Sequence, residues 1–133
     1  MIVTSQILAA IQSRFTGDAG ITAIVPAARI GTFLEQDVAY PHIKYELQFE
    51  PGNVKEGLDY SVDLDISVWS DYKGLKQLLQ IHDAIATAFE GIPVTIVSGD
   101  GYACFETGFS NSVASDGLIR QATITFKLLY GDE

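Results

Sequence analysis

The segment Asp59–Trp69 alternates between polar and apolar side chains as far as Val68, and this pattern constrains the fold more than any other feature of the chain. Side chains of a β-strand point alternately to its two faces, so period two predicts a strand with one buried and one solvated face. Tyr40–Phe49 alternates in the same way, with apolar residues at the odd positions from Ile43 onwards. These two segments predict neighbouring strands of a sheet, joined by the polar loop Glu50–Leu58.

Helical periodicity precedes these strands. Apolar residues recur at helical spacing over Gln6–Phe15, and Thr4 or Ser5 is the expected N-cap. Asp18 is expected to cap a shorter helix that ends before Pro26.

A longer helix is expected after the second strand, capped by Ser70 or Asp71 and ending near Phe89. Its inner face is predicted to comprise Leu75, Leu78, Leu79, His82, Ile85, Ala86 and Phe89.

The last part of the chain has a strand pattern again. Strands are expected at Val94–Val97, Tyr102–Phe109 and Ile119–Tyr130, with a turn at Ser98–Gly101 and a polar loop at Asn111–Gly117. The main elements follow the order α-α-β-β-α-β-β. This order predicts an α+β fold, a mostly antiparallel sheet packed against helices.

Composition limits the classes of function. The chain has 133 residues, 47% of them hydrophobic, which predicts one folded domain over residues 1–133. Its net charge of −9 argues against a simple nucleic-acid binder and against binding to anionic membranes. A single cysteine excludes an internal disulfide. Without a long apolar run or a basic N-terminus, we expect a soluble protein without a secretion signal.

The sequence offers little chemistry for catalysis. Neither His42 nor His82 lies in a recognisable motif, and Cys104 lies in a plain strand, so a nucleophile–base pair is not indicated. We interpret His82 as a histidine at the core edge with one hydrogen bond, and Cys104 as an inert thiol. Ser98–Gly101 has two glycines but joins two strands, so it is interpreted as a turn rather than a phosphate loop.

Three carboxylates share one face of the second strand: Asp59, Asp63 and Asp65. Such a face can be merely solvated, can supply an acid–base pair or a divalent cation site, or can form the wall of a channel. A metal site is the weakest of these interpretations, because no third ligand is predictable.

The order and spacing of several segments resemble the phage tail-completion family, the tail terminators or tail-to-head joining proteins of long-tailed phages, with relatives in gene transfer agents. None of these segments is a catalytic motif, and the resemblance rests on their joint order over nearly the whole chain. They are the helix ILAAIQSRF, Asp18–Val25, Ala28–Ile30, Tyr40–Tyr45, Val62–Ser70, Gly74–Phe89 and Arg120–Tyr130.

The resemblance implies a structural virion protein without enzymatic activity or cofactor. Such proteins form a ring, usually a hexamer, on the head-proximal end of the tail tube, at the neck of a virion assembled in the host cytoplasm. The implied partners are further copies of the chain, the tail tube protein and head-completion or connector proteins, while DNA passes through the lumen and no membrane is involved.

Given a ring, we expect Asp59, Asp63 and Asp65 to line its lumen or rim, where carboxylates would repel phosphates. Trp69 either packs over the helix start or lies at an interface, since aromatic residues are enriched there. The interface candidates, chosen on composition, are Pro51, Gly52, Asn53, Val54, Lys55, Trp69 and Tyr72.

Three alternatives remain open at the sequence level. One is another head–tail connector or minor tail subunit, and a second is a small ligand- or metal-binding enzyme that uses His82 with Asp63 and Asp65. The third is a generic cytoplasmic dimer with an exposed sheet edge.

Overall fold

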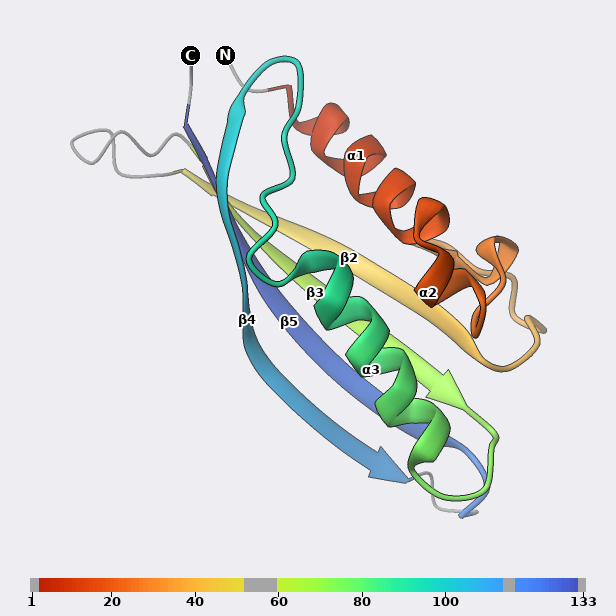
Figure 1. The fold of residues 1–133 in the computed structure, drawn as a ribbon. Coiled ribbons are helices and arrows are strands. Elements are labelled where there is room, and N and C mark those ends of the chain that lie inside the picture. Colours follow the sequence, from red (N-terminus) through yellow and green to blue (C-terminus); the bar gives the residue numbers. More distant parts are fainter. Residues whose placement is uncertain (1–2, 52–59, 114–116, 132–133) are drawn as a thin grey trace.

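The computed structural model describes residues 3–51, 60–113 and 117–131 of the chain. These residues form helices and strands in the order drawn in Figure 1. The elements are α1 (Thr4–Gly17), α2 (Ala19–Thr22), the 3-10 helix η1 (Ala27–Arg29), β1 (Ile30–Gly31), β2 (His42–Pro51), β3 (Tyr60–Ser70), α3 (Lys76–Phe89), β4 (Asp100–Val113) and β5 (Arg120–Gly131).

The strands form one sheet in the order β1-β2-β3-β5-β4. Every neighbouring pair is antiparallel except β1 and β2, which pair in parallel over two residues only. The predicted α+β fold, with a mostly antiparallel sheet, is therefore confirmed.

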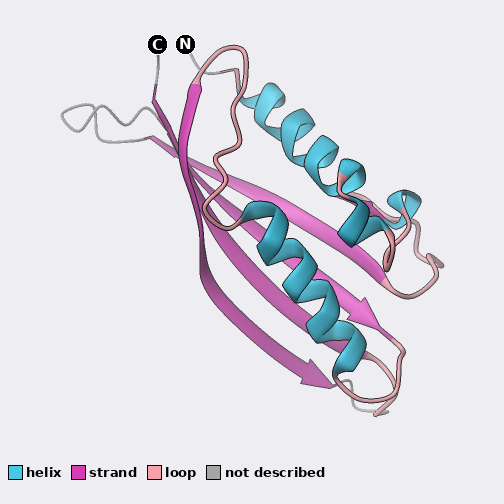
Figure 2. Ribbon diagram, in the orientation of Figure 1, coloured by secondary structure: helices cyan, strands magenta, loops and turns pink. Residues whose placement is uncertain are grey.

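Both long helices lie on the same face of the sheet (Figure 2). The alternation along β3 places its apolar residues under these helices, and Leu64 and Ile66 are completely buried. Asp63 and Asp65 point to the opposite face, which no described helix covers. We call this second surface the open face of the sheet.

An aromatic cluster joins the helices to the sheet. The Phe15 ring of α1 lies 4.9 Å, centroid to centroid, from both Tyr45 of β2 and Phe89 of α3. Phe89 in turn lies 5.7 Å from Phe126 of β5. All four rings are at most 1% exposed, so burial of their large apolar surfaces holds four elements in one core.

The predicted caps of the long helices are wrong, whereas the cap of the short helix is right. The N-cap of α1 is Val3, and the N-cap of α3 is Leu75. The side chains of these two residues accept no hydrogen bond from the backbone amides of the helices. Ser70 is still the last residue of β3. Its hydroxyl donates to the side-chain oxygen of Gln77 in the first turn of α3 and does not cap a backbone amide of that helix. Asp18 does cap α2, since its carboxylate accepts a hydrogen bond from the Ile21 amide.

The buried face of α3 is rotated from the predicted one. Leu75 and Leu79 are 38% and 39% exposed, whereas Ile81 and Ala88 are buried. Period 3.6 permits two neighbouring apolar stripes on this helix, and its docking on β3 and β5 selects one of them.

The segment before β4 differs from the prediction. Residues 94–97 do not form a strand, because only Ile96 makes a single bridge, to Gly99, and Val97 is 92% exposed. The turn lies at Val97 and Ser98, and β4 extends to Val113, into the predicted loop Asn111–Gly117. Two hydrogen bonds hold Ser98 at the start of α1 and explain the displaced turn. The Ser98 amide donates to the side-chain oxygen of Gln6, and the Val3 amide donates to the Ser98 hydroxyl.

Gly101 lies where a side chain does not fit, since an added Cβ would be 2.5 Å from the Val94 carbonyl oxygen. We expect Gly101→Ala to lower the free energy of unfolding by about 1–3 kcal/mol, because the backbone must shift. Gly17→Ala is the matched control, since an added Cβ there meets nothing within 4 Å. Urea unfolding of both variants measures the effect, and equal stabilities would contradict the packing described here.

Candidate functional site

The open face of the sheet carries most of the charged side chains that its strands contribute. The register aligns Glu46, Asp65 and Thr125 in one row and Gln48, Asp63 and Lys127 in the next. The Lys127 ammonium lies 3.7 Å from an Asp63 carboxylate oxygen. In the described strands this face therefore carries more acidic than basic groups: Glu46, Glu50, Asp63, Asp65 and Asp100 against Lys44 and Lys127.

Asp65 lies among like charges. Partial burial raises the pKa of its carboxyl group, and the neighbouring carboxylates of Asp63 and Glu46 raise it further. The predicted pair of Asp63 and Asp65 on one face is thus present, and Asp59 lies outside the described residues. Within the described part of the chain, no group of three or more His, Cys, Asp or Glu residues could hold a metal ion.

His82 lies on the helix side of the sheet, away from these carboxylates. Its Nε2 is 2.6 Å from a carboxylate oxygen of Glu106, and its ring stacks on Phe109 at 4.0 Å. The interpretation as a core-edge histidine with one hydrogen bond is confirmed. Because the sheet separates His82 from Asp63 and Asp65, the proposed combination of these residues in one active site is wrong.

Cys104 is also unsuited to catalysis. Its thiol is 2% exposed, and burial raises its pKa to about 11, so hardly any thiolate exists near neutral pH.

Trp69 lies at one end of the open face. Its ring centroid is 5.0 Å from that of His42, which in turn stacks on Tyr40 at 5.0 Å. Val68 and Ser70 on either side are buried, so Trp69 points away from the helices and does not pack over the start of α3. Burial of the His42 ring lowers its pKa, which favours the neutral imidazole in this aromatic row.

The other interface candidates are placed only in part. Tyr72 is 49% exposed just after β3, and its amide donates to the Ser70 hydroxyl. Pro51 is the last residue of β2, while Gly52, Asn53, Val54 and Lys55 lie outside the described residues.

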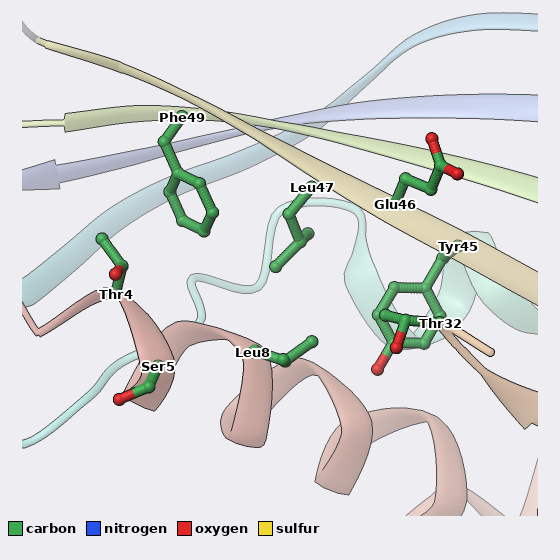
Figure 3. A pocket seen from close by; sticks show the side chains of 8 residues that line it. All are labelled: Thr4, Ser5, Leu8, Thr32, Tyr45, Glu46, Leu47 and Phe49. Carbon is green, nitrogen blue, oxygen red and sulfur yellow. The ribbon is translucent and has the colours of Figure 1, made fainter.

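A shallow groove of about 490 Å³ between α1 and β2 was not foreseen from the sequence. Leu47 and Phe49 point from β2 towards Leu8 of α1, whereas Glu46 points to the other side of the strand (Figure 3). Phe49 is 40% and Leu8 is 39% exposed, although both belong to predicted apolar faces. The groove is lined by Thr4, Ser5, Leu8, Thr32, Tyr45, Glu46, Leu47 and Phe49.

The described residues thus form a small α+β subunit with a polar open face and no constellation for catalysis. The sequence pattern of one protein family, described as Tail completion protein gp17, matches residues 9–131. The chain belongs to this family of phage tail structural proteins, which are virion components and not enzymes.

The fold has a counterpart among solved structures. A chain in the structure described as the virion of a native gene transfer agent particle superposes with a TM-score of 0.83 at 16% sequence identity. The alignment covers 97% of each chain, so the two proteins share the whole fold. No curated protein matches the sequence. None of the described helices combines the length and apolar character that a membrane crossing requires.

The crowded carboxylates of the open face give a testable effect on stability. Because the pKa of Asp65 is raised in the folded chain, the protonated form stabilises the fold and this contribution is lost as pH rises through the raised pKa. We expect Asp65→Asn to raise the free energy of unfolding at pH 7, by less than about 1 kcal/mol because solvent screens the half-exposed charges.

The gain should disappear below the ordinary carboxyl pKa of 3.8, where Asp65 is protonated in both states. Urea unfolding at pH 7 and at a pH below 3.8 measures the difference in free energy of unfolding between Asp65→Asn and the wild type. Asp83→Asn on the exposed side of α3 is the control and should show no such gain. A gain for Asp65→Asn that persists in acid would refute an electrostatic origin.

Proposed function

We propose that this chain is the subunit of a ring, with six copies as the expected number, that caps the head-proximal end of a phage or gene transfer agent tail tube. The ring stops polymerisation of the tube, offers a surface to head-completion or connector proteins and leaves a lumen for DNA. The observation that carries the proposal is the match to the tail completion family over residues 9–131. The shared fold with a chain of a gene transfer agent virion supports it.

The whole chain, residues 1–133, acts as one domain in this proposal. Assembly takes place in the host cytoplasm and places the ring at the neck of the virion. In a ring of identical subunits, each subunit contacts the next through two different surfaces, and the rotation from one subunit to the next must return to the first. Each subunit must therefore carry two different and complementary surfaces.

The open face of the sheet is the proposed wall of the lumen. It is polar, it carries Asp63 and Asp65, and no described helix covers it. DNA carries one negative charge per about 1.7 Å of its axis, and a wall rich in Lys or Arg would hold it through released counterions. Carboxylates repel the phosphates instead, so DNA would pass without being bound. Asp59 is proposed for the same wall on its position in the sequence.

The proposed contacts with other subunits and with head or tail proteins include Trp69 and Tyr72. Tyr72 is exposed and Trp69 is partly exposed near the end of β3, and aromatic residues contribute strongly to interfaces. The segment from Pro51 to Lys55 remains an interface candidate on composition.

Deletion of the gene in its phage, prophage or gene transfer agent tests the capping role. We expect tails of uncontrolled length that are not attached to filled heads, and complementation should restore normal tails. Electron microscopy of purified protein mixed with tail tubes should show rings at one end of each tube. Binding along the tube would favour a minor tail subunit, and normal infectious particles from the deletion strain would overturn the proposal.

Reversal of charge on the open face tests the lumen assignment. The variant Asp63→Lys/Asp65→Lys should still form rings, but we expect the rings to bind DNA with an affinity that falls as salt rises, and DNA delivery to decrease. Asp71→Lys/Asp83→Lys makes the same charge change at two exposed positions outside this face and is the matched control. Gel-shift assays and infectivity measure the difference, and equal DNA binding by both variants would contradict the assignment.

A further inference from the structure

One edge of the sheet has no strand neighbour over most of its length. β1 pairs with β2 only at Ile43 and Lys44, and no described strand pairs with the outer side of Tyr45–Pro51. Such an edge presents unpaired backbone N–H and C=O groups and is a template for strand addition. The groove beside Leu8 and Phe49 lies along the same stretch.

The opposite edge, β4, is covered in its first half only. The Gly91 amide donates to the Cys104 carbonyl oxygen at 2.8 Å, and the Glu106 amide donates to the Glu90 carboxylate at 2.6 Å. Beyond Glu106, residues Gly108–Val113 pair with β5 and with no other described strand. This second half of β4 is therefore the other open edge of the sheet.

The strand directions make the two edges compatible. β2, β3, β5 and β4 are each antiparallel to the next, so β4 runs opposite to β2. Copies placed side by side around an axis, with strands in the same sense, bring β4 of one copy antiparallel to β2 of the next. The sheet then continues across the contact, with the helices of both copies on the same side.

We propose that Tyr45–Glu50 of one copy pairs with Gly108–Val113 of a second copy, so that the subunit contact of the ring is a continuous antiparallel sheet. This inference rests on the proposed ring and names the surfaces that build it. In the proposed register these six residues of each copy lie opposite one another. The pairs are Tyr45 with Val113, Glu46 with Ser112, Leu47 with Asn111, Gln48 with Ser110, Phe49 with Phe109 and Glu50 with Gly108.

The side chains on both faces suit this register. On the open face the hydroxyl groups of Ser110 and Ser112 come opposite Gln48 and Glu46, to which they can donate hydrogen bonds. On the helix face Phe109 comes opposite the exposed Phe49. Residues 108–113 carry no charge, so this segment avoids repulsion with the glutamates of β2 in a chain of net charge −9.

The half-exposed side chain of Val113 points to the helix side, and the proposed register places it opposite Tyr45 of the next copy, at the wall of the groove. Burial of the apolar surfaces of this side chain and of Phe49 would stabilise the contact in addition to its backbone hydrogen bonds.

A symmetric contact between two β2 edges is disfavoured by the same groups. Antiparallel pairing centred on Gln48 would set Glu46 of each copy opposite Glu50 of the other, and like charges in such pairs are destabilising. An isologous contact would also close as a dimer and occupy the β2 edge of both copies, so that β2 could not pair with β4 in a ring.

Disulfide trapping tests the contact. The variant Gln48→Cys/Ser110→Cys should give a ladder of covalent oligomers up to the size of the ring on a non-reducing gel. The two positions lie on opposite edges of one sheet, separated by three strand spacings of about 4.8 Å and therefore by at least about 14 Å, so the bond cannot form within one chain. Gln48→Cys alone should stay monomeric on the gel, and the buried Cys104, present in every variant, should not react.

The control Gln48→Cys/Asn111→Cys places the second thiol on the opposite face of β4 and should give little product. Dimers from Gln48→Cys alone would overturn the proposal in favour of the symmetric contact. If light scattering and electron microscopy show rings of Gln48→Cys/Ser110→Cys but the gel shows no covalent oligomers, the proposed contact is wrong and the proposed ring function is not affected. A wild-type chain that never self-associates, alone or with tail tubes, would overturn both.

A second pair of variants does not depend on thiol chemistry. Phe49→Asp should lower the fraction of chains in rings at least tenfold at a given concentration, because it places a charge in the contact. Phe105→Asp is the matched control, since Phe105 is 38% exposed on the covered half of β4, against 40% for Phe49. Equal ring formation by the two variants, with unchanged far-UV circular dichroism, would also overturn the proposal.

Discussion

The contact of Phe15 with Tyr45 and Phe89 is the constraint on which the rest of the structure depends. It fixes α1 and α3 on one face of the sheet and couples the first strand pair to the last strand through Phe126. Arg14 reinforces the cluster, because its guanidinium group lies over the Phe89 ring and donates to the carbonyl oxygens of Ile92 and Pro93. With all helices on one side, the other face of the sheet is free for a different task.

This one-sided arrangement gives a small subunit three distinct surfaces. The open face is polar and acidic, which suits a wall that DNA passes, and the two open sheet edges differ in charge and in length. An asymmetric pair of edges is what a closed ring of identical subunits requires. These surfaces suit the proposed ring, and the described residues form no catalytic constellation, in agreement with membership of a structural tail family.

Several features could be predicted from the sequence because they depend on local periodicity. The alternation around Asp63 and Asp65 placed both carboxylates on one solvated face, and the Asp18 cap follows from its position before Ile21. Predictions failed where contacts with residues distant in the sequence decide which of several locally possible structures a segment adopts. Val94–Val97 has the composition of a strand, but hydrogen bonds between Ser98 and α1 draw this segment away from the sheet. Likewise, docking of α3 buries Ile81 rather than Leu79.

The sequence by itself determined the α+β class, the acidic strand face and the lack of a catalytic motif, because periodicity and residue type act over a few neighbouring positions. Only the tertiary structure decided that His82 and the aspartates lie on opposite sides of the sheet. It also decided that β1 covers just two residues of β2, and that Glu90 and Gly91 cover half of β4. These facts depend on strand order and on contacts between distant residues, which local patterns do not encode.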